Sequence, residues 1–246
     1  DVDLELLSSQ KEKIALLEKT GLDHLIIHPF TKEFSRTQSL DFVREHLVNT
    51  IGVKHLVIGY DHHFGRNREG SFEHLKEFGP IYGFEVEEIA ALDIDQVNVS
   101  STKIRNALAE GKVELANNYL GSTYSISGSV VKGDQIGRTI GFPTANIECD
   151  FEHKLLPADG VYAGLLHVNG EEYPAMANLG GRPTLKSAQR KLEVHCIGIE
   201  IELYGADVKF ELTHHLRDIQ EFDNLEGLKK QFAADKSEAT RLLAQK

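Results

Sequence analysis

A glycine-rich stretch in the middle of the chain reads Val131-Lys132-Gly133-Asp134-Gln135-Ile136-Gly137-Arg138-Thr139-Ile140-Gly141-Phe142-Pro143-Thr144-Ala145-Asn146. Its glycines lack a Cβ atom, so the backbone can turn sharply or approach a ligand closely. Thr144 and Asn146 are two residues apart, and in an extended segment such residues point to the same side. They could therefore give two oxygen ligands to one Mg²⁺ ion. From the residues alone, a phosphate-binding loop and a turn that only connects two strands both stay open, since glycine-rich turns are common.

The segments around and after this stretch, as far as about residue 225, favour β-structure. They alternate apolar and polar residues or gather β-branched and aromatic ones, with Gly and Pro between them. Regular short strands of this kind indicate a small antiparallel barrel. A final helix is expected to open near Asp223 and Glu226, with Leu228, Phe232 and Leu242 on its apolar side. The expected strands lie near residues 124–132, 161–168, 172–178, 191–199 and 207–214.

The N-terminal part of the chain has a different pattern, in which strands and helices alternate. Ser9 followed by Glu12 predicts a capping box at the start of a helix that Gly21 ends. Ser39 is expected to cap a second helix and Gly52 to end it. This alternation favours a parallel sheet that binds ligands beyond the carboxyl ends of its strands. Buried strands are expected at 23–28 and 54–58, another strand near 84–89, and helices near 71–78 and 103–110.

Composition and charge narrow the class of protein. The chain has 246 residues, which is enough for two ordinary domains. The change of pattern predicts a Rossmann-like α/β domain over residues 1–112 and a barrel domain over 113–246. The net charge of −11 argues against a general nucleic-acid binder, and no apolar run is long enough to span a bilayer. Cys149 and Cys196 lack metal-site spacing, so we expect free thiols in the cytoplasm.

The glycine-rich stretch is part of a longer resemblance. The run Gly-Arg-x-x-Gly-Phe-Pro-Thr-Ala-Asn at residues 137–146 resembles the signature of riboflavin kinases. Further pieces agree with that family in order and cover nearly all of residues 122–246. They are Gly160-Val161-Tyr162-Ala163-Gly164, Asn178-Leu179-Gly180-Gly181-Arg182-Pro183-Thr184, Leu192-Glu193-Val194-His195, Leu203-Tyr204-Gly205, and Leu216-Arg217 with the later Phe222.

The resemblance implies a six-stranded barrel with ATP and Mg²⁺ at the Pro-Thr-Ala-Asn turn and a catalytic carboxylate that corresponds to Glu193. A positioned carboxylate can accept the proton of the ribityl 5′-hydroxyl as that oxygen attacks the γ-phosphate of ATP. By its pattern alone, Glu193 is better explained as a solvated residue on the wet face of a strand, since exposed strand carboxylates are usually just solvated. His195 falls on the same face, and only a supporting role is considered for it.

The other expected kinase residues follow from the same stretch and the same resemblance. Arg217 could hold a phosphate or stack on the flavin ring, and a surface ion pair with a nearby acid is the alternative. ATP or phosphate binding is expected from Lys132, Gly137, Arg138, Gly141, Thr144 and Asn146, metal ligation from Thr144 and Asn146, and flavin binding from Phe142 and Arg217.

Two segments of the N-terminal half indicate a second activity. One is Ile58-Gly59-Tyr60-Asp61-His62-His63-Phe64-Gly65, and the other is Val99-Ser100-Ser101-Thr102-Lys103-Ile104-Arg105. Hydroxyls and free N–H groups at a helix N-terminus suit an anion, but Ser-Ser-Thr is also ordinary capping chemistry, which physics alone favours. The pair resembles the nucleotidyltransferase half of the bifunctional bacterial flavin enzymes. That resemblance implies nucleotide binding by Gly59, Asp61, Ser100, Ser101, Thr102 and Arg105.

The N-terminal half also departs from that family. His62 and His63 stand where the family has Phe and Arg, and no Gly-x-Phe-Asp-Gly-x-His-x-Gly-His segment occurs in the sequence. In the family that segment supplies histidines that stabilise phosphate charge during adenylyl transfer. Since the only Met is Met176, we expect the natural protein to carry this segment upstream of Asp1. The alternative is that the chain lacks this activity.

Three functions follow as alternatives. The first is ATP- and Mg²⁺-dependent phosphorylation of riboflavin to FMN, with adenylylation of FMN to FAD by the N-terminal domain of the intact protein. The second is a monofunctional riboflavin kinase with a degenerate N-terminal domain. The third is a flavin-binding protein without turnover, which would need neither a base at Glu193 nor a metal turn at Thr144 and Asn146. The expected partners are riboflavin, FMN and ATP, without nucleic acid or membrane.

Overall fold

The computed structural model describes residues 5–90, 93–94, 97–133, 141–181, 190–199 and 203–245. Contacts divide the chain into two compact units. One is Thr20–Val99, and the other joins Asp1–Lys19 to Ser100–Lys246. This division follows packing and does not test where the two expected domains meet, so the boundary at residues 112 and 113 stays a prediction.

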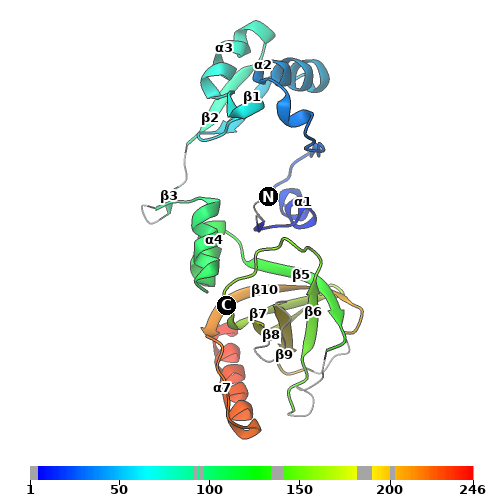
Figure 1. The fold of residues 1–246 in the computed structure, drawn as a ribbon, viewed down its shortest axis with the longest axis vertical. Coiled ribbons are helices and arrows are strands. Elements are labelled where there is room, and N and C mark those ends of the chain that lie inside the picture. Colours follow the sequence, from blue (N-terminus) through cyan, green and yellow to red (C-terminus); the bar gives the residue numbers. More distant parts are fainter. Residues whose placement is uncertain are drawn as a thin grey trace. The chain divides into compact units, whose positions relative to one another are not determined.

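Six antiparallel strands form a closed barrel in the larger unit (Figure 1). Neighbours around the barrel follow the order β10-β5-β6-β9-β8-β7. This confirms the expected six-stranded barrel, although the sequence pattern predicted five of the strands and missed the short β6. The strands are β5 (Tyr124–Val131), β6 (Ala145–Cys149), β7 (Gly160–Val168), β8 (Glu171–Gly180), β9 (Lys191–Cys196) and β10 (Asp207–Arg217).

The barrel interior is filled by one face of each strand. Along β5, Tyr124, Ile126, Gly128 and Val130 are buried and alternate with partly exposed residues. This alternation has the period of two that a strand imposes. By contrast, nearly all of β7 is buried, because a helix covers its outer face. Gly164 of β7 lies so close to the Glu211 carbonyl of β10 that a Cβ there would overlap it.

The covering helix is α7 (Leu225–Leu243), which packs against β7, β8 and β10 (Figure 1). Ala239 of the helix is fully buried against Ala163 and Met176, with Phe232 at the side of this cluster. The helix begins after Asn224, whose side chain accepts a hydrogen bond of 2.8 Å from the Gly227 N–H. The expected start at Asp223 is thus wrong by one residue.

Two further helices belong to the barrel unit: α4 (Ser101–Ala109) and α5 (Val113–Leu120). The sequence predicted α4 but not α5. The Asn117 side chain joins α5 to the barrel, because it donates to the Leu212 carbonyl at 2.8 Å and accepts from the Tyr124 N–H at 2.7 Å. None of the described helices is long and apolar enough to cross a membrane.

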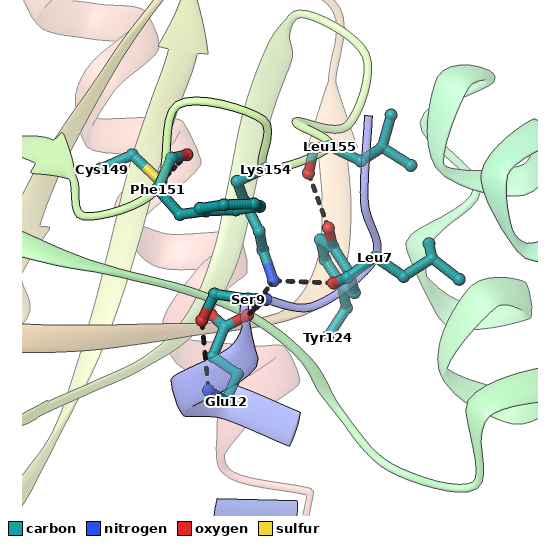
Figure 2. Close-up of polar contacts among 8 residues, drawn as sticks. All are labelled: Leu7, Ser9, Glu12, Tyr124, Cys149, Phe151, Lys154 and Leu155. Atoms are coloured by element: carbon teal, nitrogen blue, oxygen red, sulfur yellow. Dashed lines mark hydrogen bonds and ion pairs between the residues drawn. The ribbon is translucent and has the colours of Figure 1, made fainter. Parts of the chain in front are cut away.

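The N-terminal segment also packs on the barrel unit. The helix α1 (Gln10–Glu18) starts with the expected capping box of Ser9 and Glu12. The Lys154 ammonium is buried beneath it, 2.7 Å from a Glu12 carboxylate oxygen and 2.8 Å from the Leu7 carbonyl (Figure 2). Burial lowers the pKa of Lys154, and the Glu12 carboxylate opposes that shift. A buried ion pair therefore fixes α1 in place.

The unit of residues 20–99 contains a two-stranded parallel sheet, as the alternating pattern predicted. The strands are β1 (His55–Gly59) and β2 (Glu85–Ile89). Val43, Leu75 and Phe84 form its buried core. The other elements of the chain are η1 (Phe34–Arg36), α2 (Ser39–Asp41), the π-helix η2 (Phe42–Ile51), η3 (Arg66–Arg68), α3 (Phe72–Tyr82), β3 (Asp93–Ile94) and β4 (Val97–Asn98).

The second expected helix has the predicted end but a different start. Gly52 ends it in the left-handed conformation, with φ of 73°. Gln38 occupies the cap position, and Ser39 is the first helical residue. The Ser39 N–H donates to a Glu69 carboxylate oxygen at 2.8 Å, so the expected capping role of Ser39 is wrong.

The expected buried strand at 23–28 is also wrong. These residues form no strand, and Ile26 and Ile27 are 66% and 54% exposed. The burial expected for β1 is only partial, since Val57 is 45% exposed. A strand needs a neighbouring strand for its N–H and C=O groups and a covering layer for its side chains. An apolar run in the sequence does not show that either is present.

Candidate functional site

Three polar residues form a row across neighbouring strands of the barrel. The register pairs Asn146 on β6 with Glu193 on β9, and pairs Glu193 with Asn178 on β8. Residues paired across antiparallel strands point to the same face, with Cβ atoms about 4.5–5.5 Å apart. Leu192 and Val194, which flank Glu193, are buried, so Glu193 points away from the barrel interior. One carboxylate and two amides therefore meet on the outer face of the barrel.

The Asn146 side chain is held tightly at one end of this row. The backbone of Gly133 lies against it, and a Cβ at residue 133 would overlap the amide group. The Asn146 Oδ1 atom is buried and has no hydrogen-bond partner among the described residues. A buried oxygen without a donor is unusual and fits a ligand that supplies positive charge.

Other predicted phosphate-binding residues surround Asn146 in sequence. Thr144 is half-buried and immediately precedes β6, while Lys132 is exposed just after β5. Continuing the β6–β9 register by one residue would bring Thr144 opposite His195. Gly141 has φ of +85°, a conformation in which a side chain would be strained. Gly137 and Arg138 lie outside the described residues.

An aromatic cluster stands beside the row. The His195 ring is buried, and its centroid lies 5.7 Å from that of Phe142 and 5.5 Å from that of Phe232. Its Nδ1 is 2.9 Å from the Pro143 carbonyl oxygen. Burial lowers the pKa of His195. The hydrogen bond to the Pro143 carbonyl opposes this downward shift, and the positive charge of Lys236 adds to it. The cluster thus joins the glycine-rich stretch, β9 and α7.

Arg217 at the end of β10 makes several hydrogen bonds within the protein. Its Nε and Nη2 atoms donate to the buried Asp235 carboxylate, with the shortest distance 2.7 Å. Its Nη1 donates to the Asp218 carbonyl, and Gln231 donates to Asp235 at 2.8 Å. The guanidinium carbon lies 5.9 Å from the centroid of the Phe222 ring. Arg217 therefore has an acidic partner, as the alternative expected, but the pair is largely buried and not on the surface. A flavin contact stays a prediction.

The residues expected to bind nucleotide in the N-terminal half lie in different units. Gly59 ends β1, and Asp61 is exposed in the turn that follows. Ser100 caps α4, and its hydroxyl accepts a 3.4 Å hydrogen bond from the Lys103 N–H. Ser101, Thr102 and Arg105 follow in the first turns of this helix, and the Arg105 Nε donates to the Glu5 carbonyl. Gly59 and Asp61 therefore belong to one compact unit, and the residues from Ser100 onward belong to the other.

The other thiols and metal-ligating side chains of the described residues form no second centre of the same kind. Cys149 and Cys196 are free thiols, and burial raises the pKa of Cys196 to about 11. In the described part of the chain, no three His, Cys, Asp or Glu side chains are grouped to hold a metal. A pocket of about 640 Å³ beside α1 is lined by none of the predicted kinase residues.

Sequence reasoning missed one neighbour of Glu193 and one neighbour of His195. Asn178 joins the row only through the β8–β9 register, and Phe232 reaches the cluster from α7. Asn178 lay within a quoted family segment, yet nothing there showed its partner. Phe232 was expected only as an apolar residue of the last helix. Strand pairing and helix docking are long-range properties that local spacing does not encode.

Comparison with known proteins gives matches to both halves of the chain. A riboflavin kinase family model matches residues 120–243, and an FAD synthetase model matches residues 2–103. The bifunctional riboflavin kinase/FMN adenylyltransferase of Escherichia coli K12 is 37% identical over 230 residues, which cover 93% of this chain and 73% of that protein. The protein of the same description from Haemophilus influenzae is 38% identical over 226 residues, covering 92% and 73%.

One solved structure is also similar over most of the chain. It is described as a macrolide-efflux protein from Streptococcus pneumoniae, with 29% identity and a TM-score of 0.85. The match covers 94% of this chain and 74% of that one. The similarity extends through both units.

Proposed function

Because the chain belongs to the bifunctional riboflavin kinase/FMN adenylyltransferase family, we propose that it phosphorylates riboflavin to FMN with ATP. We also propose that the N-terminal part of the intact protein adenylylates FMN to FAD. The observation that carries the kinase assignment is the row of Asn146, Glu193 and Asn178 beside the glycine-rich stretch. It combines a carboxylate with a buried amide oxygen that has no hydrogen-bond partner among the described residues, both on one face.

Glu193 is the proposed catalytic base. In this reaction the ribityl 5′-hydroxyl oxygen attacks the γ-phosphorus of ATP, the bond to the β–γ bridging oxygen breaks, and ADP leaves. The Glu193 carboxylate takes the hydroxyl proton as the new P–O bond forms. The half-buried position of Glu193 on a barrel strand supports this role, because a rigid strand holds the carboxylate in a fixed direction.

Thr144 and Asn146 are the proposed ligands of Mg²⁺. When bound, this ion neutralises charge on the β- and γ-phosphates of ATP. The buried Asn146 Oδ1, which has no partner in the part of the chain that the structure describes, supports the assignment. Thr144 precedes Asn146 by two residues. Lys132, Gly137, Arg138 and Gly141 are proposed to bind the phosphates, and Phe142 and Arg217 to contact the flavin.

For the adenylyl transfer we propose nucleotide binding at two places, one on each compact unit. Gly59 and Asp61 follow a parallel strand, where ligands of such sheets bind. The start of α4 offers backbone N–H groups and hydroxyls to a phosphate. This residue set is Gly59, Asp61, Ser100, Ser101, Thr102 and Arg105. We propose residues 1–112 for this activity, residues 113–246 for the kinase, and the cytoplasm as the location, where free thiols persist.

The overall test is product analysis. The protein is incubated with riboflavin, ATP and Mg²⁺, and the flavins are then separated. FMN supports the kinase assignment, and FAD in addition supports adenylylation by this chain. A protein that binds riboflavin but converts none of it is a binding protein, and the proposal is then wrong.

Glu193→Gln tests the base. We expect riboflavin binding to persist and kcat for FMN formation to fall by about 10²–10⁴-fold, since a general base contributes that much. The matched control is Glu148→Gln, which removes an exposed carboxylate further along β6. If Glu193→Gln forms FMN at the parent rate, Glu193 is not the base.

Thr144→Ala tests the metal assignment. The Mg²⁺ concentration that gives half-maximal rate should rise severalfold, because one oxygen ligand is lost. Thr50→Ala in the other compact unit serves as the control. An unchanged Mg²⁺ dependence would exclude Thr144 as a ligand.

A further inference from the structure

His195 is buried in a way that fixes its ring. It is 6% exposed and lies on β9, two residues after Glu193 on the same face. The rings of Phe142 and Phe232 meet it nearly edge to face, with interplanar angles of 75° and 77°. Phe142 and Phe232 also contact each other, with centroids 4.3 Å apart. The aromatic walls leave the imidazole little freedom to rotate.

One ring nitrogen reaches the glycine-rich stretch. The Nδ1 atom is 2.9 Å from the Pro143 carbonyl oxygen, and because a carbonyl can only accept, Nδ1 must carry the hydrogen. The Pro143 carbonyl belongs to the same peptide group as the Thr144 N–H. A hydrogen bond to this carbonyl therefore fixes the orientation of the Pro143–Thr144 peptide plane. That orientation in turn affects the direction of the Thr144 and Asn146 side chains.

The other ring nitrogen shows that the residue does more than fill space. The His195 Nε2 atom is buried and has no hydrogen-bond partner among the described residues. An unpaired buried polar atom costs free energy, and an aromatic hydrocarbon ring would fill the same space without that cost. The hydrogen bond to Pro143 is the interaction that such a ring could not replace.

From these contacts we propose that His195 is a positioning residue for phosphoryl transfer, which holds the Pro143–Thr144 peptide so that Thr144 and Asn146 face the ATP phosphates. This inference rests on the proposed kinase function. His195 and Glu193 are on one strand, so the strand that carries the base also fixes the turn that carries the metal ligands. Phe232 of α7 packs against the His195 ring and takes no part in the hydrogen bond to Pro143.

The test compares three variants of the full chain. His195→Phe keeps an aromatic ring and removes the donor. His195→Asn keeps an N–H donor near the position of Nδ1. Phe232→Leu loosens the aromatic wall and leaves the hydrogen bond in place. For each, kcat, the KM for ATP, the KM for riboflavin and the Mg²⁺ concentration for half-maximal rate are measured, with circular dichroism as the check on folding.

We expect His195→Phe to raise the KM for ATP and the Mg²⁺ requirement by about tenfold, as outer-shell changes do at metal sites. The KM for riboflavin should change less than twofold. His195→Asn should recover most of the loss, and Phe232→Leu should show no selective effect on ATP and Mg²⁺.

Parent-like kinetics of His195→Phe overturn the proposal, as does an Asn variant that is as impaired as the Phe variant. If His195→Phe does not fold, the comparison of His195→Asn with His195→Gln tests the proposal instead. The Asn amide lies near the position of Nδ1, whereas the Gln amide lies near that of Nε2. Equal ATP kinetics of these two overturn the proposal, and a defect only in the Gln variant supports it. A parent protein that makes no FMN refutes the kinase function itself, before any variant is compared.

Discussion

At the scale of single residues, Gly133 and Asn146 depend on each other. The Gly133 backbone lies so close to Asn146 that a Cβ atom on residue 133 would overlap the Asn146 amide. Asn146 cannot simply move aside, because it is on a strand paired on both sides, with Val131 of β5 and Glu193 of β9. The absence of a side chain at residue 133 therefore controls where a proposed metal ligand points.

Gly133→Ala should displace the Asn146 side chain and reduce FMN formation by about tenfold or more, with a higher Mg²⁺ requirement. Steady-state kinetics at several Mg²⁺ concentrations measure this. The control is Gly227→Ala, where a Cβ would make only ordinary contacts in the first turn of α7. Equal kinetics of the two variants would show that the position of Asn146 does not matter.

The sequence predicts site roles for Thr144, Asn146 and Glu193 because their residue types and their family resemblance are local. It did not identify Asn178 as a neighbour of Glu193, nor the bond between His195 and Pro143. Both depend on strands that are distant in the sequence, so their pairing register must be known first.

At the scale of elements, α7 is anchored to β10 by the ion pair of Arg217 and Asp235. The side chains are 17% and 5% exposed, and their shortest distance is 2.7 Å. A partly buried, multiply bonded pair resists separation, because either partner left alone retains a poorly solvated charge. The helix in turn carries Phe232, which touches His195.

Asp235→Leu should destabilise the protein by about 3–5 kcal/mol, because it leaves the Arg217 charge without its partner. Urea denaturation measures the loss. The double variant Arg217→Met with Asp235→Leu removes both charges and should regain a large part of the stability. If the double variant is no more stable than the single one, the loss comes from packing of α7 and not from the unpaired charge.

Several elements were predicted with the right type and others were not. The capping box at Ser9 and the glycine stop at Gly52 were predicted, because caps are local chemistry. The strand β6 was missed, since it has only five residues and begins directly after the Pro-Thr turn. Residues 23–28 have the composition of a buried strand but do not pair with a strand. The helix α5 was also missed, and it begins at Val113, directly after the expected domain boundary.

At the scale of the whole molecule, the chain start is held by the barrel unit. Leu6 bridges to Lys154, with Leu6 N–H donating to the His153 carbonyl at 2.7 Å and Leu155 N–H to the Leu6 carbonyl at 2.9 Å. Lys154 also lies over the Tyr124 ring, with its ammonium 4.5 Å from the centroid (Figure 2). Segments more than 140 residues apart in sequence thus share one ion pair.

Glu12→Gln should release α1 from the barrel, because the buried Lys154 ammonium loses its counter-charge. The loss of stability is capped at about 3–5 kcal/mol, since the helix can detach and let water reach Lys154. Limited proteolysis should cut near residues 5–19 faster than in the parent. The exposed Glu18→Gln on the same helix is the control, and equal cleavage of both variants would contradict the role of this pair.

The sequence by itself determined the two kinds of architecture, an α/β part and a β-barrel, and it predicted the residue types of a phosphoryl-transfer site. These follow from hydrophobic period, turn residues and ordered motifs, which are all local. Only the tertiary structure decided the row of Asn146, Glu193 and Asn178, the buried His195 and the attachment of residues 5–19 to the barrel unit. Such contacts join distant segments, and their geometry is set by strand register and by side-chain burial, which exist only once the chain has folded.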